Sequence, residues 1–237
     1  MRARHWRFMP ERYREWQGRV GPDGCVVAGE LHSPLKMLHV VLGPLKTTFL
    51  LADYPDRATE LLALHEAAML DLVGQMAEAG VQVMMSMDNL DTSFHPPRYV
   101  ERYSAPYYEK AAALCRRHGS LLFIHACGQQ RRNLKLIASL GVDGLEGVAF
   151  PPLGDVDLDE VRRLAGDRMI VTGGISAMEY KQLGTQDEIF AYVRSLFARL
   201  RPYAHRFILS ASCGTPYTAP WEKIVHFRDA WRQCGDC

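Results

Sequence analysis

The sequence has no long apolar run and no excess of charge of either sign. Of its 237 residues, 28 are Lys or Arg and 27 are Asp or Glu, so the formal net charge is +1. A balanced charge gives no electrostatic reason for binding nucleic acid. The longest apolar runs, such as residues 37–42, are too short to span a bilayer. We therefore expect neither a nucleic-acid partner nor a membrane protein.

The chain also lacks an apolar signal core and a second CxxC pair. Its basic N-terminal segment, MRARHWRFMPERYREW, contains no such core, so we expect a cytoplasmic protein. In that setting the cysteines are thiols or metal ligands rather than a disulfide framework. Cys234 and Cys237 have CxxC spacing at the terminus, which we interpret as a frayed end, with adventitious metal binding as the minor alternative. The six cysteines are Cys25, Cys115, Cys127, Cys213, Cys234 and Cys237.

Six short apolar runs predict buried strands. They are nearly continuous in apolar residues, as parallel strands covered on both faces should be. With 48% hydrophobic residues, the chain can bury the core of one large domain, which we expect to span residues 1–237. The predicted strands cover residues 24–30, 81–88, 121–127, 144–150, 168–173 and 206–212.

Helical patterns alternate with these runs. Strand and helix in alternation predict an α/β fold with a parallel sheet. In a (β/α)8 barrel the carboxyl ends of the strands meet at one mouth, whereas in an open sheet they spread along an edge. We count six strands, and a closed barrel needs eight. The predicted helices cover residues 56–79, 98–118 with a kink at Pro106, 129–140, 157–165, 185–200 opened by a Thr185–Glu188 capping box, and 220–232.

Potential metal ligands follow three of the predicted strands. His125 and Cys127 lie in the stretch FIHACG at the end of one predicted strand, Glu146 lies in the next strand, and Cys213 follows the last one. Two thiolates, an imidazole and a carboxylate are a suitable tetrahedral set for zinc. Ligands spread over three strands indicate a catalytic site with one exchangeable ligand rather than a zinc finger. The alternative is that His125 is a satisfied core histidine and that the cysteines are inert packing.

Polar side chains follow two earlier strands. Asp88 and Asn89 come directly after a predicted strand, and Asp88 is either a site carboxylate or a helix cap. Glu30 and His32 follow the first strand, where a surface turn is favoured over a site.

Paired glycines and paired tyrosines complete the candidates. Gly173 and Gly174 in TGGIS either offer backbone N–H groups to an anion or form a tight turn between strand and helix. Tyr107 and Tyr108 are expected to pack in the core.

Several stretches resemble the uroporphyrinogen decarboxylase superfamily. They are FIHACG, LGVDGLEGVAFPP, GDRMIVTGGIS, LGTQDEIFAYV and FILSASCGTPYTAPWEKI. The likeness covers most of residues 24–232 and is strongest after residue 120. It is greatest to the zinc-dependent methyltransferase branch, because the His-x-Cys and distal Cys of that branch fall on His125, Cys127 and Cys213. Related cobalamin-independent methionine synthases add a Glu, and Glu146 is the matching position.

The resemblance implies a TIM-barrel-like fold and a methyl transfer. The donor would be a methylcorrinoid on a partner protein, and the acceptor a small thiol or a related molecule. Zinc would hold the incoming thiol as a thiolate, and the acceptor would displace Glu146. Asp88 is expected to accept a hydrogen bond from His125 and to act with Glu146 in catalysis. Asn89, Gly173 and Gly174 are expected to bind the cofactor.

The sequence also departs from the family. Family members extend further at the N-terminus, so we expect a barrel that lacks its first one or two βα units. Such a barrel would expose two strand edges, which favours self-association or a second chain that completes the barrel. Two alternatives stay open: a decarboxylase-type lyase acting on a tetrapyrrole, although the family's N-terminal Arg-rich motif is missing, and an incomplete, non-catalytic barrel subunit.

Overall fold

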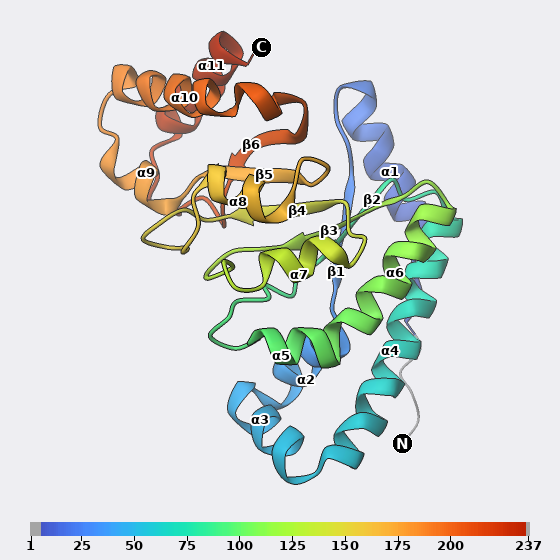
Figure 1. Ribbon diagram of the computed structural model, residues 1–237. Coiled ribbons are helices and arrows are strands. Elements are labelled where there is room, and N and C mark those ends of the chain that lie inside the picture. Colours follow the sequence, from blue (N-terminus) through green and yellow to red (C-terminus); the bar gives the residue numbers. More distant parts are fainter. Residues whose placement is uncertain (1–5, 236–237) are drawn as a thin grey trace.

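Six parallel strands form the centre of the computed structural model, which describes residues 6–235. They lie in sequence order, each hydrogen-bonded to the next (Figure 1). The predicted α/β class and all six predicted strands are therefore confirmed. The strands are β1 (Val27–Leu31), β2 (Val83–Ser86), β3 (Leu121–His125), β4 (Gly144–Val148), β5 (Ile170–Ile175) and β6 (Phe207–Ala211).

Helices cover the sheet and bury its apolar residues. Leu122, Ile124 and Leu145 of the central strands are fully buried, as expected for strands packed on both faces. Helix α4 (Pro55–Glu78) packs against α6 (Ala105–Arg117), α7 (Leu134–Ser139) against α8 (Leu158–Ala165), and α10 (Gln186–Leu200) against α11 (Trp221–Cys234) (Figure 1). The capping box predicted at the start of α10 is present, with Thr185 and Glu188 bonded reciprocally.

Two predicted helices have different bounds. The segment 98–118 divides into α5 (Pro97–Tyr99), a π-helical turn η2 (Val100–Ser104) and α6. Pro106 has no N–H to donate to the preceding turn, and a π-helical turn is one way a helix accommodates this loss. The segment 129–140 is helical only in α7, because the backbone N–H groups of Gln130 and Arg131 donate to Asp155 instead.

The sequence patterns did not predict several short elements. These are α1 (Pro10–Val20), the 3-10 turn η1 (Gly21–Asp23), α2 (Pro34–Leu42), α3 (Pro44–Asp53), α9 (Ala177–Gln182) and the 3-10 turn η3 (Arg201–Arg206). Helix α2 begins directly after β1, with Ser33 as its N-cap and Pro34 in its first turn. Glu30 is exposed, as expected, but it lies inside β1, and the half-buried His32 lies between β1 and α2, so the chain passes from strand to helix without the expected turn.

The sheet is not closed within residues 6–235. Strands β1 and β6 each have one neighbour, so each leaves an unpaired edge. Val27 on β1 is 43% exposed and Ile208 on β6 is 53% exposed. The expectation of a partner or a second copy at these edges stays a prediction, and Cys237 of the predicted tail lies outside the described residues.

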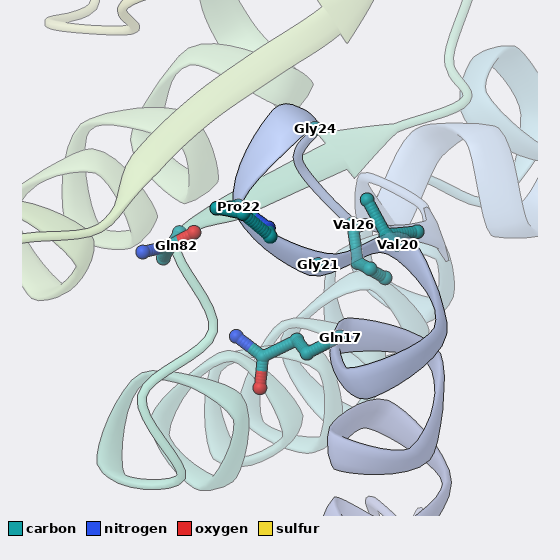
Figure 2. A pocket seen from close by; sticks show the side chains of 7 residues that line it. All are labelled: Gln17, Val20, Gly21, Pro22, Gly24, Val26 and Gln82. Carbon is teal, nitrogen blue, oxygen red and sulfur yellow. The ribbon is translucent and has the colours of Figure 1, made fainter.

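One cavity of about 260 Å³ lies at the amino end of the sheet (Figure 2). It is formed by α1, η1 and the residues that precede β1 and β2. In parallel barrels, residues at this end serve stability, and the chemistry lies at the opposite end. Its lining residues are Gln17, Val20, Gly21, Pro22, Gly24, Val26 and Gln82.

In the part of the chain that the structure describes, no single helix is long and apolar enough to cross a membrane, although α2 and α3, bent by 117°, pass the test as a pair.

A pair of histidines joins α2 to the segment before α5. The rings of His39 and His95 lie 4.6 Å apart between centroids, inclined at 55°. Burial, followed by the charge of Lys36, lowers the pKa of His39 to about 4. Burial, followed by His39 and Lys36, lowers the pKa of His95 to about 3, against the opposing effect of Asp91. The fold therefore holds both imidazoles uncharged at neutral pH.

From the lowered pKa values of His39 and His95 we predict that the folded protein loses stability in acid. Below pH about 6.5 the unfolded chain binds protons that the folded chain does not, so the free energy of unfolding falls as the pH drops toward 4. For His95 the slope is at most about 1.4 kcal/mol per pH unit. Chemical denaturation between pH 7.5 and 4.5 should show a flatter profile for His95→Gln than for wild type. The variant of the exposed His118, His118→Gln, should keep the wild-type slope.

Candidate metal centre

Three of the predicted ligands converge at the carboxyl end of the sheet. His125 ends β3, Cys127 follows two residues later, and Cys213 lies two residues beyond β6. Their ligand atoms all lie within 4.8 Å of one another. His125 is buried, Cys127 is half-buried and Cys213 is exposed, so the cluster is open to solvent on the side of β6.

A glycine that the sequence analysis overlooked permits this approach. Gly147 in β4 has φ +75°, and a Cβ there would lie 2.4 Å from the carbonyl oxygen of Ser212 and 2.8 Å from Cε1 of His125. Both distances are too short for any side chain, so only glycine lets the backbone fit between these groups. A glycine directly after Glu146, within an apolar strand, was the available signal.

Glu146 takes a different place from the one expected. It is in register with His125 on the neighbouring strand, and its carboxylate pairs with Nδ1 of the imidazole. It lies outside the group formed by His125 and the two cysteines. Engagement of Nδ1 leaves Nε2 of His125 as the nitrogen for a metal, an arrangement common at zinc sites. The acceptor on His125 is thus Glu146, and the expectation that Asp88 fills this role is wrong.

The cluster separates charge in the metal-free protein. Burial alone would lower the pKa of His125, but hydrogen bonds with Cys127 and Glu146 outweigh it and raise that pKa to about 10. Burial alone would raise the pKa of Cys127, but His125 and then Cys213 outweigh it and lower that pKa. The imidazole is therefore protonated at neutral pH, and the thiolate form of Cys127, which is the form that binds metal, is favoured relative to an ordinary thiol.

Asp88 is fully buried and fixes the start of α2. Its Oδ1 accepts from the backbone N–H of Ser33 at 2.8 Å and from the hydroxyl of Ser86 at 3.2 Å. Ser86 in turn contacts the hydroxyl of Tyr108 at 2.8 Å. Tyr107 and Tyr108 are buried with ring centroids 5.2 Å apart, so their predicted packing is confirmed. These contacts give Asp88 a structural role, and a catalytic one stays a prediction.

Among the predicted cofactor residues, Asn89 lies apart from Gly173 and Gly174, because two strands separate β2 from β5. Asn89 follows β2 with φ +62°, and its carbonyl accepts from the side chain of Gln130. Gly173 and Gly174 lie inside β5, so the tight-turn interpretation is wrong. A Cβ on Gly173 would lie 2.6 Å from the carbonyl oxygen of Val148, and the N–H of Gly174 donates to the Ser212 hydroxyl at 3.3 Å. The glycines thus serve strand packing beside Cys213, and cofactor binding there stays a prediction.

The donor set suits zinc. Two sulfurs and one imidazole nitrogen match the ligand types of catalytic zinc sites, which use three protein ligands and keep a fourth position open. The hydrogen-bonded Glu146 supplies the outer contact that such a histidine needs.

The charge pair predicts an unusual pH profile for thiol alkylation in metal-free protein. A lowered pKa keeps Cys127 as reactive thiolate at pH values where an ordinary thiol is protonated. Peptide mapping by mass spectrometry should show the iodoacetamide rate at Cys127 rising at lower pH than the rate at the exposed Cys25. In His125→Gln the rate at Cys127 and pH 6.5 should fall about tenfold or more, since about 1% of an ordinary thiol is ionised there. An unchanged profile in this variant would contradict the ion pair.

Comparisons with known proteins agree with this fold. Among curated proteins, none matches the chain. Among solved structures, a methyltransferase from Methanosarcina mazei is similar, with a TM-score of 0.72 and 19% sequence identity. The alignment covers 94% of this chain and 63% of the methyltransferase, so the chain spans less than two thirds of that protein. At this identity the likeness shows the fold, which is TIM-barrel-like with an unclosed sheet in residues 6–235.

A family model places the chain more firmly. The model for uroporphyrinogen decarboxylase (URO-D) matches residues 19–234, which include every strand and all of the candidate metal centre. The chain therefore belongs to the uroporphyrinogen decarboxylase family.

Proposed function

We propose that this protein is a zinc-dependent methyltransferase. It would move a methyl group from a methylcorrinoid, carried by a partner protein, to a thiol or a related acceptor. The observation that supports this most directly is the convergence of His125, Cys127 and Cys213 within 4.8 Å at the carboxyl end of the sheet. The sequence resemblance adds support, because decarboxylases proper do not use this pair of cysteines. The name of the Methanosarcina mazei neighbour points the same way.

Each residue of the centre has a separate proposed role. His125, Cys127 and Cys213 would hold the ion, and bound zinc would supply a Lewis acid that keeps an incoming thiol as thiolate. Glu146 orients the ring of His125 through Nδ1. To bind metal through Nε2, His125 must give up the proton on that nitrogen, which its pKa of about 10 retains at neutral pH, while its Nδ1 stays paired with Glu146. Cys213 is exposed, which supports entry of the acceptor from its side of the centre.

The unpaired strand edges favour a second candidate function. If β1 and β6 must pair with another chain before the mouth is complete, this chain is an assembly subunit with no turnover of its own. Native mass spectrometry and an assay of methyl transfer in isolated protein separate the two functions. An assembly subunit would associate with another chain and show no methyl transfer alone, whereas the methyltransferase would be active in isolation.

Zinc content and methyl transfer test the proposal together. We expect about one zinc per chain by plasma mass spectrometry, because one three-ligand centre binds one ion. We also expect methylcobalamin to be consumed when a small thiol is added, and the absorbance of the corrinoid measures this consumption. Cys127→Ser and Cys213→Ser should lose both properties. Cys25→Ser, at an exposed cysteine outside the cluster, should keep both, and zinc that persists in Cys213→Ser would contradict the ligand set.

Glu146→Gln tests the outer contact. The amide keeps the shape of the side chain but removes the charge that orients His125, so zinc affinity should fall by about 10- to 100-fold without being abolished. Competition with a chromophoric chelator measures this affinity. A loss as complete as in Cys213→Ser would instead make Glu146 a direct ligand.

A further inference from the structure

A second cavity lies at the same end of the sheet as the metal centre. It has a volume of about 260 Å³ and is formed by α2, the start of α3 and the segment between β2 and α5. Its polar lining consists of Lys36, His39, Asn89, Asp91 and His95. Its apolar lining consists of Val40, Pro44 and Phe94.

His95 lines this cavity and has unused hydrogen-bonding atoms in its buried ring. The side chain is 2% exposed, and neither ring nitrogen has a hydrogen-bond partner among the residues that the structure describes. Buried polar atoms are rarely left unpaired, because they lose hydrogen bonds to water without replacement. The ring contacts His39, which also lines the cavity. An acceptor atom of a ligand would satisfy the N–H group of an uncharged imidazole at this position.

Two formal charges line the cavity, the ammonium of Lys36 and the carboxylate of Asp91. No ion pair of Lys36 is found in residues 6–235, and its side chain is half-buried. The carboxylate of Asp91 is already engaged, since Oδ1 accepts from the N–H of Ser93 at 2.7 Å and Oδ2 from the N–H of Gln129 at 2.8 Å. Because burial keeps both imidazoles uncharged at neutral pH, the free donors are a cation and neutral N–H groups.

We propose that this cavity binds a small aliphatic oxyanion, with a carboxylate as the simplest case. The ammonium of Lys36 would neutralise the head group, and the imidazole of His95 would donate to one of its oxygens. The short apolar part would lie against Val40, Pro44 and Phe94. The volume of about 260 Å³ equals roughly nine water molecules at about 30 Å³ each, which limits the ligand to a small molecule. This proposal does not depend on the proposed methyl transfer.

Calorimetric titration with sodium butyrate tests the proposal, with butyramide as its uncharged counterpart of similar shape. We expect butyrate to bind zinc-loaded wild-type protein with an affinity about tenfold or more above that of butyramide, because only butyrate pairs with Lys36. Lys36→Met should remove this preference. Lys46→Met is the matched control, since Lys46 is exposed on the adjacent helix α3, does not line the cavity, and should leave the preference unchanged.

A second variant and a second measurement separate this site from the metal centre. Cys213→Ser should still bind butyrate, since the cavity contains none of the three clustered ligands. The imidazole nitrogen resonances of His95, assigned with His95→Gln, should shift when butyrate is added. Equal affinity for butyrate and butyramide, or unchanged binding in Lys36→Met, would mean that the cavity holds only water. Loss of binding in Cys213→Ser would place the anion at the metal centre and overturn the proposal.

Discussion

The close approach of β4 to its surroundings at Gly147 is the constraint on which the candidate metal centre depends. Strands β3 and β6 are separated by two others, so His125 and Cys213 meet only because the sheet curves tightly at its carboxyl end. The backbone of Gly147 fills the space between the His125 ring and the carbonyl of Ser212, the residue before Cys213. A side chain there would separate the two halves of the ligand set. The geometry of the centre is thus set by a residue that offers no ligand itself.

The carboxylate of Glu146 gives the centre its charge balance. A buried histidine ordinarily loses its proton, yet here the carboxylate and a thiol hold it as imidazolium. The same proton must leave when a metal binds, so metal affinity rises with pH across the neutral range. The contact between Glu146 and Nδ1 therefore sets the orientation of the ring, and together with Cys127 it couples metal binding to proton release.

The sequence predicted the strands well because burial on both faces requires a nearly continuous apolar run. Such a run can be recognised in the local sequence without knowledge of distant contacts. It also predicted that His125, Cys127 and Cys213 cluster, since strand ends in a parallel sheet share one edge, although Glu146, the fourth predicted ligand, lies outside that group. It did not predict the partner of His125, because Asp88 and Glu146 are equivalent as residue types and only the register of β3 with β4 selects between them. The helix at Pro34 was overlooked because its apolar residues, such as those of the run 37–42, are nearly continuous and form no helical stripe, and the helix at Pro44 follows it directly. The cavity that these helices form with His95 depends on contacts across more than fifty residues.

The nearness of Cys127 to Cys213 has a further consequence, which concerns oxidation. A thiolate is the form of cysteine that oxidants attack, and a neighbouring thiol converts the resulting sulfenic acid into a disulfide. The sulfurs of Cys127 and Cys213 lie within 4.8 Å of each other, so in the metal-free protein the second sulfur is close enough to react. Metal and oxidant thus compete for the same two sulfurs, so an empty centre is the vulnerable one and a reductant restores its capacity to bind.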